Sequence, residues 1–194
     1  LKTIFNRYLR LFAPYVVALL VTIACAWVAR FWVQDEFVGE SETIGQFLAH
    51  LFFLQGILGL DSISAGVWYV AIDFQLYVVL IALAYILQTP KNWMRFGGPR
   101  VLSTGVAIVC ATSMLWFNHF ESYDDWAIYF FGAYGLGVLA AWSRRSRFDA
   151  TIFWCVVAIA LCALWIDLRA RLALALLTAT WLAIRPKGTD HWTP

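Results

Sequence analysis

Seven long apolar stretches constrain the fold of this chain more than any other feature. They cover residues 12–33, 44–60, 67–87, 101–117, 126–142, 151–166 and 171–184. A helix that crosses a bilayer needs about 20 consecutive apolar residues. The last two stretches are long enough only if flanking charges, such as Asp167, Arg169 and Arg171, extend to the interface. None of the seven alternates with a period of two, so the sequence predicts an all-α, polytopic transmembrane helix bundle.

The composition agrees with a membrane protein. Of the 194 residues, 62% are hydrophobic and 13% are charged, whereas a soluble domain carries about 25% charged residues. This excludes a soluble globular domain and a disordered chain. The net charge is only +2, and its Lys and Arg residues form short clusters, which excludes a nucleic-acid-binding surface. We therefore expect one transmembrane domain over residues 1–194, with membrane lipids as its surroundings.

The charges between the apolar stretches predict which segments face the cytoplasm. Lys and Arg gather in residues 1–11, 88–100, 143–150 and 185–194, whereas acidic residues gather in residues 35–42 and 118–125. Short loops rich in Lys and Arg favour the cytoplasmic side of a membrane. Both ends of the chain are therefore predicted to be cytoplasmic.

The second apolar stretch conflicts with this pattern if it spans the membrane. Seven spans would place the basic loop 88–100 outside. The stretch 44–60 has about 17 residues and carries Gln46, His50 and Gln55. We therefore predict six spanning helices and one re-entrant or interfacial helix on the outer face. The alternative keeps seven spans and accepts one exception to the charge rule, which is statistical.

Asp73 is the only acid well inside a long apolar stretch. A carboxylate in the bilayer core is costly, so such a residue usually has a function and a partner. On a helix, Tyr69, Asp73 and Tyr77 share one face, which we expect to point into the bundle. Asp73 is a candidate proton acceptor or orienter for a hydroxyl nucleophile, with Gln75 and Tyr77 beside it. The alternative is a buried hydrogen bond between helices.

Arg30 is a candidate partner for Asp73. From the helical rise, Asp73 lies about 9 Å below the start of its helix and Arg30 about 5 Å from the outer end of the first span. Both positions fall in the outer half of the membrane. The alternative is that Arg30 reaches headgroups while Asp73 bonds Tyr or Gln side chains. Arg30, His50, Trp68 and Tyr69 are the candidate substrate-binding residues.

Arg7, Arg10 and Tyr15 form a basic and aromatic helix start. Guanidinium groups suit phosphate, so two arginines three residues apart are candidates to hold a nucleotide-type donor. The alternative is a positively charged anchor at the headgroups. No His pair has the spacing of metal ligands, so no metal is predicted.

Two segments resemble motifs of the acyltransferase 3 family. Residues 68–77, WYVAIDFQLY, are similar to the family's Trp-Ser-Leu-Ser-Val-Glu-Glu-Gln-Phe-Tyr motif. Residues 7–15, RYLRLFAPY, resemble its Arg-x-x-Arg-Leu-x-Pro-x-Tyr segment. Residues 130–137 are similar to a family segment that ends in Leu-Gly. The resemblance extends roughly from Leu1 to Ala141.

Members of this family are O-acyltransferases of the bacterial inner membrane. They move acetyl or related groups from cytoplasmic acyl-CoA to sugar hydroxyls of lipopolysaccharide and other polysaccharides. The resemblance implies that Asp73 replaces the motif's first Glu, that Gln75 and Tyr77 are retained, and that Arg7 and Arg10 meet CoA phosphates. It implies acyl-CoA and a carbohydrate acceptor as substrates, with no bound cofactor and no protein partner.

The chain departs from the family in two respects. Phe74 replaces the motif's second Glu, and no Arg followed ten residues later by the family's His occurs here. Because that pattern is absent, and the chain begins with Leu1, we expect it to lack the family's first helix. The alternatives are a non-catalytic truncated relative, or a transporter of a small solute or lipid-linked glycan in which Asp73 and Arg30 line the path.

Overall fold

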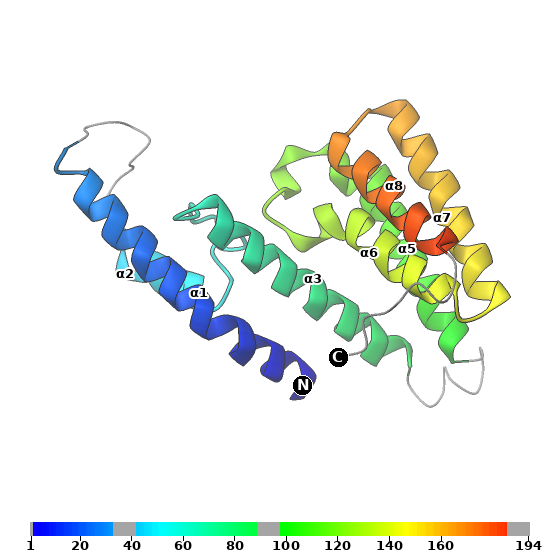
Figure 1. Ribbon diagram of the computed structural model, residues 1–194, viewed down its shortest axis with the longest axis horizontal. Coiled ribbons are helices and arrows are strands. Elements are labelled where there is room, and N and C mark those ends of the chain that lie inside the picture. The colour runs from blue at the N-terminus through cyan, green and yellow to red at the C-terminus, as the bar shows by residue number, and fades with distance from the viewer. Residues whose placement is uncertain (1, 33–41, 89–97, 186–194) are drawn as a thin grey trace. The chain divides into compact units, whose positions relative to one another are not determined.

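The computed structural model describes residues 2–32, 42–88 and 98–185, and these form helices and turns without a strand (Figure 1). The all-α prediction is confirmed for these residues. The helices are α1 (Lys2–Ala29), α2 (Ile44–Leu51), α3 (Ala65–Leu87), α5 (Pro99–Leu115), α6 (Ala127–Ser143), α7 (Arg147–Ile166) and α8 (Ala170–Ile184). Two short 3₁₀ helices, η2 (Phe117–His119) and η3 (Glu121–Tyr123), lie between α5 and α6.

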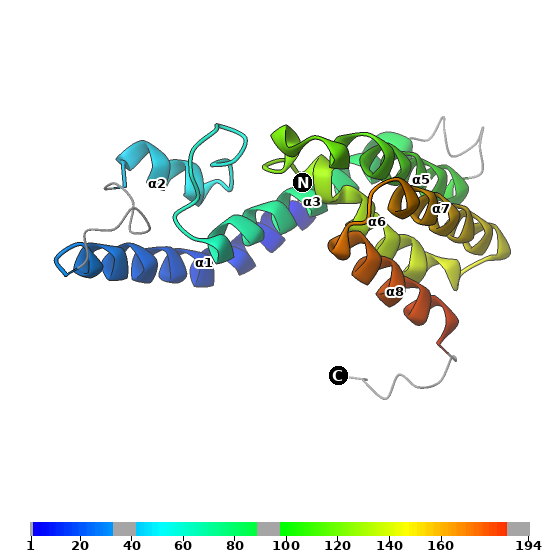
Figure 2. The same ribbon diagram turned by 90° about the horizontal axis from the view of Figure 1, so that it is seen from above.

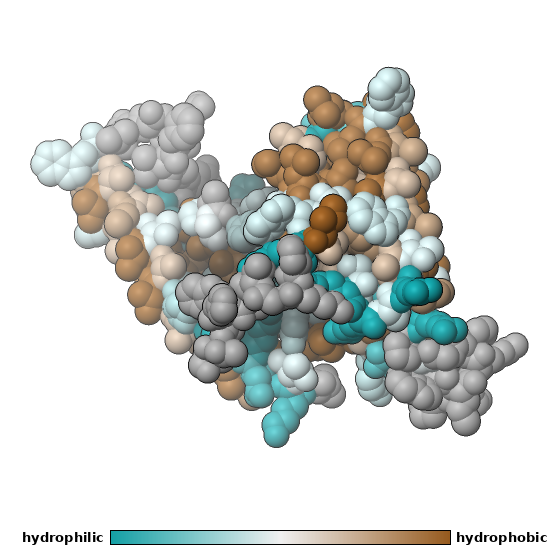
Figure 3. All heavy atoms as spheres, turned by 45° about the vertical axis from the view of Figure 1, so that its right-hand side comes forward, coloured by the Kyte–Doolittle hydropathy of each residue, from teal (hydrophilic) through white to brown (hydrophobic). Residues whose placement is uncertain are grey.

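Within the described part of the chain, four helical segments are long and apolar enough to cross a membrane: Lys2–Ala29, Gly66–Leu87, Arg100–His119 and Arg147–Ile166. The apolar helices α6 and α8 are shorter, with 17 and 15 residues. Large apolar side chains are exposed along these helices, including Trp165, of which 92% is accessible. Figure 3 shows apolar side chains gathered over a wide area of the surface. Such surfaces suit lipid rather than water, as expected of a membrane protein.

The chain divides into two compact units. The first contains residues 1–79 with 125–127, and the second contains residues 80–124 and 128–194. Helix α3 begins in the first unit and ends in the second. The prediction of one domain over residues 1–194 stays a prediction.

In the first unit, α1 runs in the opposite direction to α3 (Figures 1 and 2). Tyr15 and Leu19, one helical turn apart, are buried on the inner face of α1. They form a core with Phe53, Val67 and Ala71. Because Val67 and Ala71 lie in the first two turns of α3, this helix starts beside the middle of α1.

The 42–64 segment fills the space beside α1 before α3 begins. Its only helix, α2, has eight residues and is about 12 Å long, which is too short to cross a bilayer. The chain turns at Phe53, whose φ is +58°, and comes back along itself. Gln46 Nε2 donates to the Asp61 carbonyl at 2.7 Å on the way. A spanning helix over residues 44–60, as the seven-span alternative requires, is therefore not formed.

In the second unit, close contacts hold the helices together. Gly135 of α6 lies against Cys110 of α5, and a Cβ at this glycine would overlap the Cys110 sulfur. Buried Asp149, in the first turn of α7, accepts hydrogen bonds from the hydroxyls of Ser103 on α5 at 2.5 Å and Ser146 at 2.7 Å. The same Ser146 hydroxyl caps α7 by accepting from the Asp149 N–H. The buried carboxylate thus connects α7 to α5.

Candidate functional site

The acid singled out by the sequence is paired with an arginine of the first helix. Arg7 Nη2 donates to Asp73 Oδ2 at 2.7 Å. The two residues are 66 positions apart, and each belongs to one of the segments that resemble acyltransferase motifs. The packing of α1 against α3 therefore brings these two segments into direct contact.

Tyr77 completes this cluster, which we call the Arg7–Asp73–Tyr77 site. The Arg7 guanidinium carbon lies 4.3 Å from the centroid of the Tyr77 ring. One turn separates Asp73 from Tyr77 on α3, so both side chains reach the same arginine, as their shared face predicts. Arg7 Nε is buried and has no hydrogen-bond partner among the described residues. Arg7 thus makes one ion pair and one ring contact, and it has N–H groups left that can donate further hydrogen bonds.

The site is accessible to a ligand. The side chains of Arg7 and Asp73 keep 36% and 35% of their accessible surface. No described residue donates a hydrogen bond to the second carboxylate oxygen of Asp73, Oδ1. That oxygen can accept a hydrogen bond or a proton from a bound hydroxyl, while Arg7 holds the carboxylate in place through Oδ2.

Tyr8, Tyr15 and Gln75 position the turn at Phe53 beside this site. Gln75 Nε2 donates to the Phe53 carbonyl at 2.9 Å, and the Tyr8 hydroxyl donates to the Leu51 carbonyl at 3.1 Å. The Phe53 ring is buried and packs edge-on to Tyr15 with centroids 4.6 Å apart. A bulky residue at positive φ is strained, and these bonds and ring contacts compensate for that strain. The contacts of Gln75 and Tyr15 are therefore with the 42–64 segment.

His50 closes the 42–64 segment. Its Nδ1 lies 2.7 Å from the Gln46 carbonyl, and its Nε2 accepts from the Ile63 N–H at 3.3 Å. A carbonyl can only accept, so Nδ1 carries the proton and Nε2 does not. Burial lowers the pKa of His50, which also favours the neutral ring. Both nitrogens are occupied and the side chain is fully buried, so in this conformation His50 serves the fold of the segment.

The predicted Arg30–Asp73 pair is wrong. Arg30 instead forms a two-pronged pair with Glu42, with Nη2–Oε1 and Nη1–Oε2 distances of 2.7 and 3.1 Å. This contact holds the pKa of Glu42 below its usual value. The prediction assumed that α3 starts level with the outer end of α1, whereas α3 starts beside the middle of α1. Asp73 is consequently level with Arg7, near the start of α1.

The remaining predicted site residues differ in their exposure. Tyr69 is 66% exposed, so it does not share the inward orientation expected for its face. Trp68 is half-buried, and Arg10 is exposed. Arg7 and Arg10 therefore differ in role within this fold, because only Arg7 lies on the packed face of α1. The binding roles predicted for Trp68, Tyr69 and Arg10 stay predictions.

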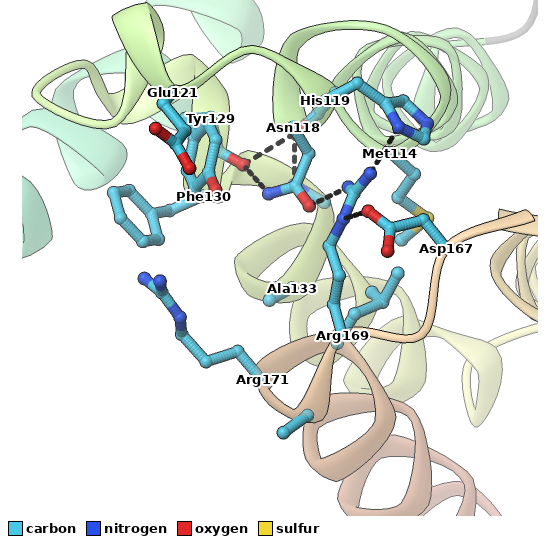
Figure 4. Close-up of a pocket in the computed structure, with 14 residues that line it drawn as sticks. Met114, Asn118, His119, Glu121, Tyr129, Phe130, Ala133, Asp167, Arg169 and Arg171 are labelled. Carbon is cyan, nitrogen blue, oxygen red and sulfur yellow. Dashed lines mark hydrogen bonds and ion pairs between the residues drawn. The ribbon is translucent and has the colours of Figure 1, made fainter. Parts of the chain in front are cut away.

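A second candidate site is a cavity of about 350 Å³ within the second unit. It lies where α5 ends, α6 and α8 begin, and α7 ends (Figure 4). Arg169 is at its centre. Its Nε donates to Asp167 Oδ2 at 2.7 Å, its Nη1 to Asn118 Oδ1, and its Nη2 contacts His119 Nδ1. Through these contacts Arg169 connects the α7–α8 turn to η2, and we refer to the three contacts together as the Arg169 clamp.

Arg171 and Glu121 supply the remaining charges of this cavity. The Arg171 guanidinium lies 5.5 Å from the centroid of the Phe130 ring, and Figure 4 shows its side chain directed towards that ring. Arg171 forms no ion pair with a carboxylate in the described part of the chain. With Glu121 and Tyr129 also on the wall, the cavity suits a polar ligand with both donor and acceptor groups.

The sequence did not single out this cavity. Asp167, Arg169 and Arg171 were interpreted as charges that extend to the interface. The alternation of the helices places the 118–125 loop and the α7–α8 turn at the same end of the bundle. Their position at the same end of the bundle was the one feature of the sequence that could have indicated a contact between these polar residues.

Comparison of the chain with known protein families, curated proteins and solved structures finds no match.

Proposed function

We propose that this protein is an integral-membrane O-acyltransferase that moves an acyl group from acyl-CoA to a carbohydrate hydroxyl. The observation that carries the proposal is the Arg7–Asp73 ion pair at 2.7 Å. It joins the two segments that independently resemble the acyltransferase 3 family. Both side chains of the pair keep about a third of their surface, so a bound substrate can reach the carboxylate.

The proposed topology has six spanning helices, with the 42–64 segment re-entrant from the outer face and both ends in the cytoplasm. The shortness of α2 and the return of the chain after Phe53 support it. The helices α6 and α8 are about 26 and 23 Å long. They cross the membrane in this topology if the bilayer thins around them or if their flanking residues lie in its interface. This arrangement leaves every basic loop inside, as the charge rule favours.

In this topology Asp73 lies closer to the cytoplasm than a pairing with Arg30 would place it, because it is level with Arg7 near the start of α1. A bacterial inner membrane presents acyl-CoA on that side. The carboxylate is therefore closer to the donor than a position beside Arg30 would make it. This placement favours a role at the step where the donor's thioester is attacked.

The proposed step is a direct acyl transfer. The acceptor hydroxyl oxygen attacks the thioester carbonyl, the new C–O ester bond forms, and the C–S bond breaks. Asp73 Oδ1 accepts the hydroxyl proton, which then goes to the departing CoA thiolate. Arg7 keeps the carboxylate oriented, and the donor capacity left on Arg7 is available to the oxygen of the tetrahedral intermediate.

The test is transfer of labelled acetyl from acetyl-CoA to membrane glycans, in membranes that contain the full chain. Asp73→Asn is expected to reduce transfer at least about a hundredfold, as removal of a general base does. Asp73→Glu, which restores the carboxylate of the family motif, is expected to recover part of it. Glu42→Gln is the matched control, because it removes a paired carboxylate from the same unit and should leave transfer unchanged.

Equal transfer by the wild type and Asp73→Asn would remove Asp73 from the mechanism. A wild-type chain that transfers no label would overturn the enzyme proposal itself.

A further inference from the structure

The second unit holds a pocket whose charged lining residues are all arginines. It is an open pocket of about 440 Å³ at the turn between α6 and α7, beside the end of α8. Arg144, Arg145, Arg147 and Arg185 line it together with Trp154. We refer to it as the arginine pocket. It is at the opposite end of α6, α7 and α8 from the cavity around Arg169.

The positive charges of Arg144, Arg145 and Arg147 are not balanced by carboxylates among the described residues. Arg144, Arg145 and Arg147 form no salt bridge with any described carboxylate, and no carboxylate lines the pocket. The nearby acid, Asp149, is 6% exposed and bonded to Ser103 and Ser146. Like charges gathered in one concavity repel each other and raise the local concentration of anions.

Two of the arginines are held in place by aromatic rings. The Arg145 guanidinium lies 5.2 Å from the centroid of Trp142, and that of Arg185 lies 5.7 Å from the centroid of Trp181. A guanidinium above a ring is stabilised by the ring's electrons without using its N–H donors. Such a group loses less freedom when it binds an anion, and its planar donors match two oxygens of a phosphate.

We propose that the arginine pocket binds a phosphate group. The ligand carries either a phosphodiester, as in the headgroup of an anionic lipid, or the phosphate of a soluble compound. Both have oxygen atoms that guanidinium groups bind in pairs. The Trp154 ring on the wall gives the pocket an apolar side against which the remainder of such a ligand packs. This binding does not depend on acyl transfer.

The experiment uses the full chain purified in a neutral detergent and has two arms. In the first, isothermal titration calorimetry measures binding of inorganic pyrophosphate. In the second, native mass spectrometry compares retention of phosphatidylglycerol with retention of phosphatidylcholine. Each arm is run on the wild type, Arg144→Gln and Arg147→Gln. Arg100→Gln is the matched control, because Arg100 lies at the same end of the unit, over Phe148, but outside the pocket.

We expect Arg144→Gln and Arg147→Gln each to weaken binding about tenfold in at least one arm, as loss of one charge-assisted contact does. A loss in the first arm identifies a soluble phosphate compound as the source, and a loss in the second identifies a lipid. Arg144→Lys keeps the charge without the paired donors, and it should bind with intermediate affinity. This variant also decides the matter if a Gln variant does not fold.

Two results would overturn the proposal. One is that no pocket variant differs from the wild type in either arm. The other is that Arg100→Gln weakens binding as much as the pocket variants, which would show a response to net charge alone.

Discussion

The Arg7–Asp73 ion pair allows a quantitative test by a double-mutant cycle. Arg7→Gln removes the hydrogen bond to Asp73 and the contact with Tyr77. Hydrogen bonds to charged groups contribute about 1.5–3 kcal/mol, and a partly exposed cation–π contact contributes about 0.5–1 kcal/mol. Because both side chains keep about a third of their surface, solvent screening favours the lower part of these ranges.

We therefore expect Arg7→Gln to lower the free energy of unfolding by about 2 kcal/mol and Asp73→Asn by about 1.5 kcal/mol. The double variant should lose about 2 kcal/mol rather than the sum, because the second substitution removes a charge that has already lost its partner. The coupling energy between the two positions is then about 1.5 kcal/mol.

Unfolding is followed by tryptophan fluorescence as sodium dodecyl sulfate is titrated into neutral micelles. The control cycle combines Arg7→Gln with Glu42→Gln, two positions whose partners differ, and its effects should add within about 0.5 kcal/mol. A coupling below about 0.5 kcal/mol between Arg7 and Asp73 would refute the ion pair as a stabilising contact.

Three further predictions concern other contacts. Burial lowers the pKa of His50 below the value of about 6.5 that an unfolded His has. His50 therefore contributes its full stabilisation above that pH, and this contribution decreases as the pH falls from there towards the pKa of the folded state. Hydrogen exchange around Ile63, corrected for intrinsic rates, should rise at the lower pH in the wild type, and His50→Asn should remove that dependence. Arg169→Lys keeps the charge but cannot keep all three contacts of the clamp, so detergent unfolding should show a loss of about 1–3 kcal/mol; an unchanged stability would contradict the clamp. Gly135→Ala should cost about 1–3 kcal/mol because its Cβ meets the Cys110 sulfur, and Cys110→Ala in the same chain should recover part of that loss.

The helical class, and the need of Asp73 for a partner, were predictable from residue patterns. An isolated acid in an apolar stretch needs a partner, and Asp73 has one. The partner itself was not predictable, because the depth of each residue had been counted from the ends of the helices. Helix α3 begins beside the middle of α1, and this offset replaces Arg30 by Arg7 as the neighbour of Asp73.

Polar contacts made across distant loops were the part that residue patterns did not indicate. Arg169 meets Asn118 and His119 only because the ends of α5 and α7 are adjacent, and periodicity within one helix carries no such information. The same applies to His50. It was expected on a helix over residues 44–60, whereas α2 ends at Leu51, and its two backbone partners depend on the return of the chain after Phe53.

The eight-residue length of α2 has a consequence for the biogenesis of the protein. Helices α1 and α3 are long and apolar enough to insert as membrane segments, whereas α2, with eight residues, is too short. The carbonyls of Leu51 and Phe53 obtain their donors from Tyr8 on α1 and Gln75 on α3, and an unsatisfied carbonyl in lipid is costly. In the proposed topology, the segment between these helices therefore enters the bilayer last, after the ribosome has delivered both of the helices that receive it.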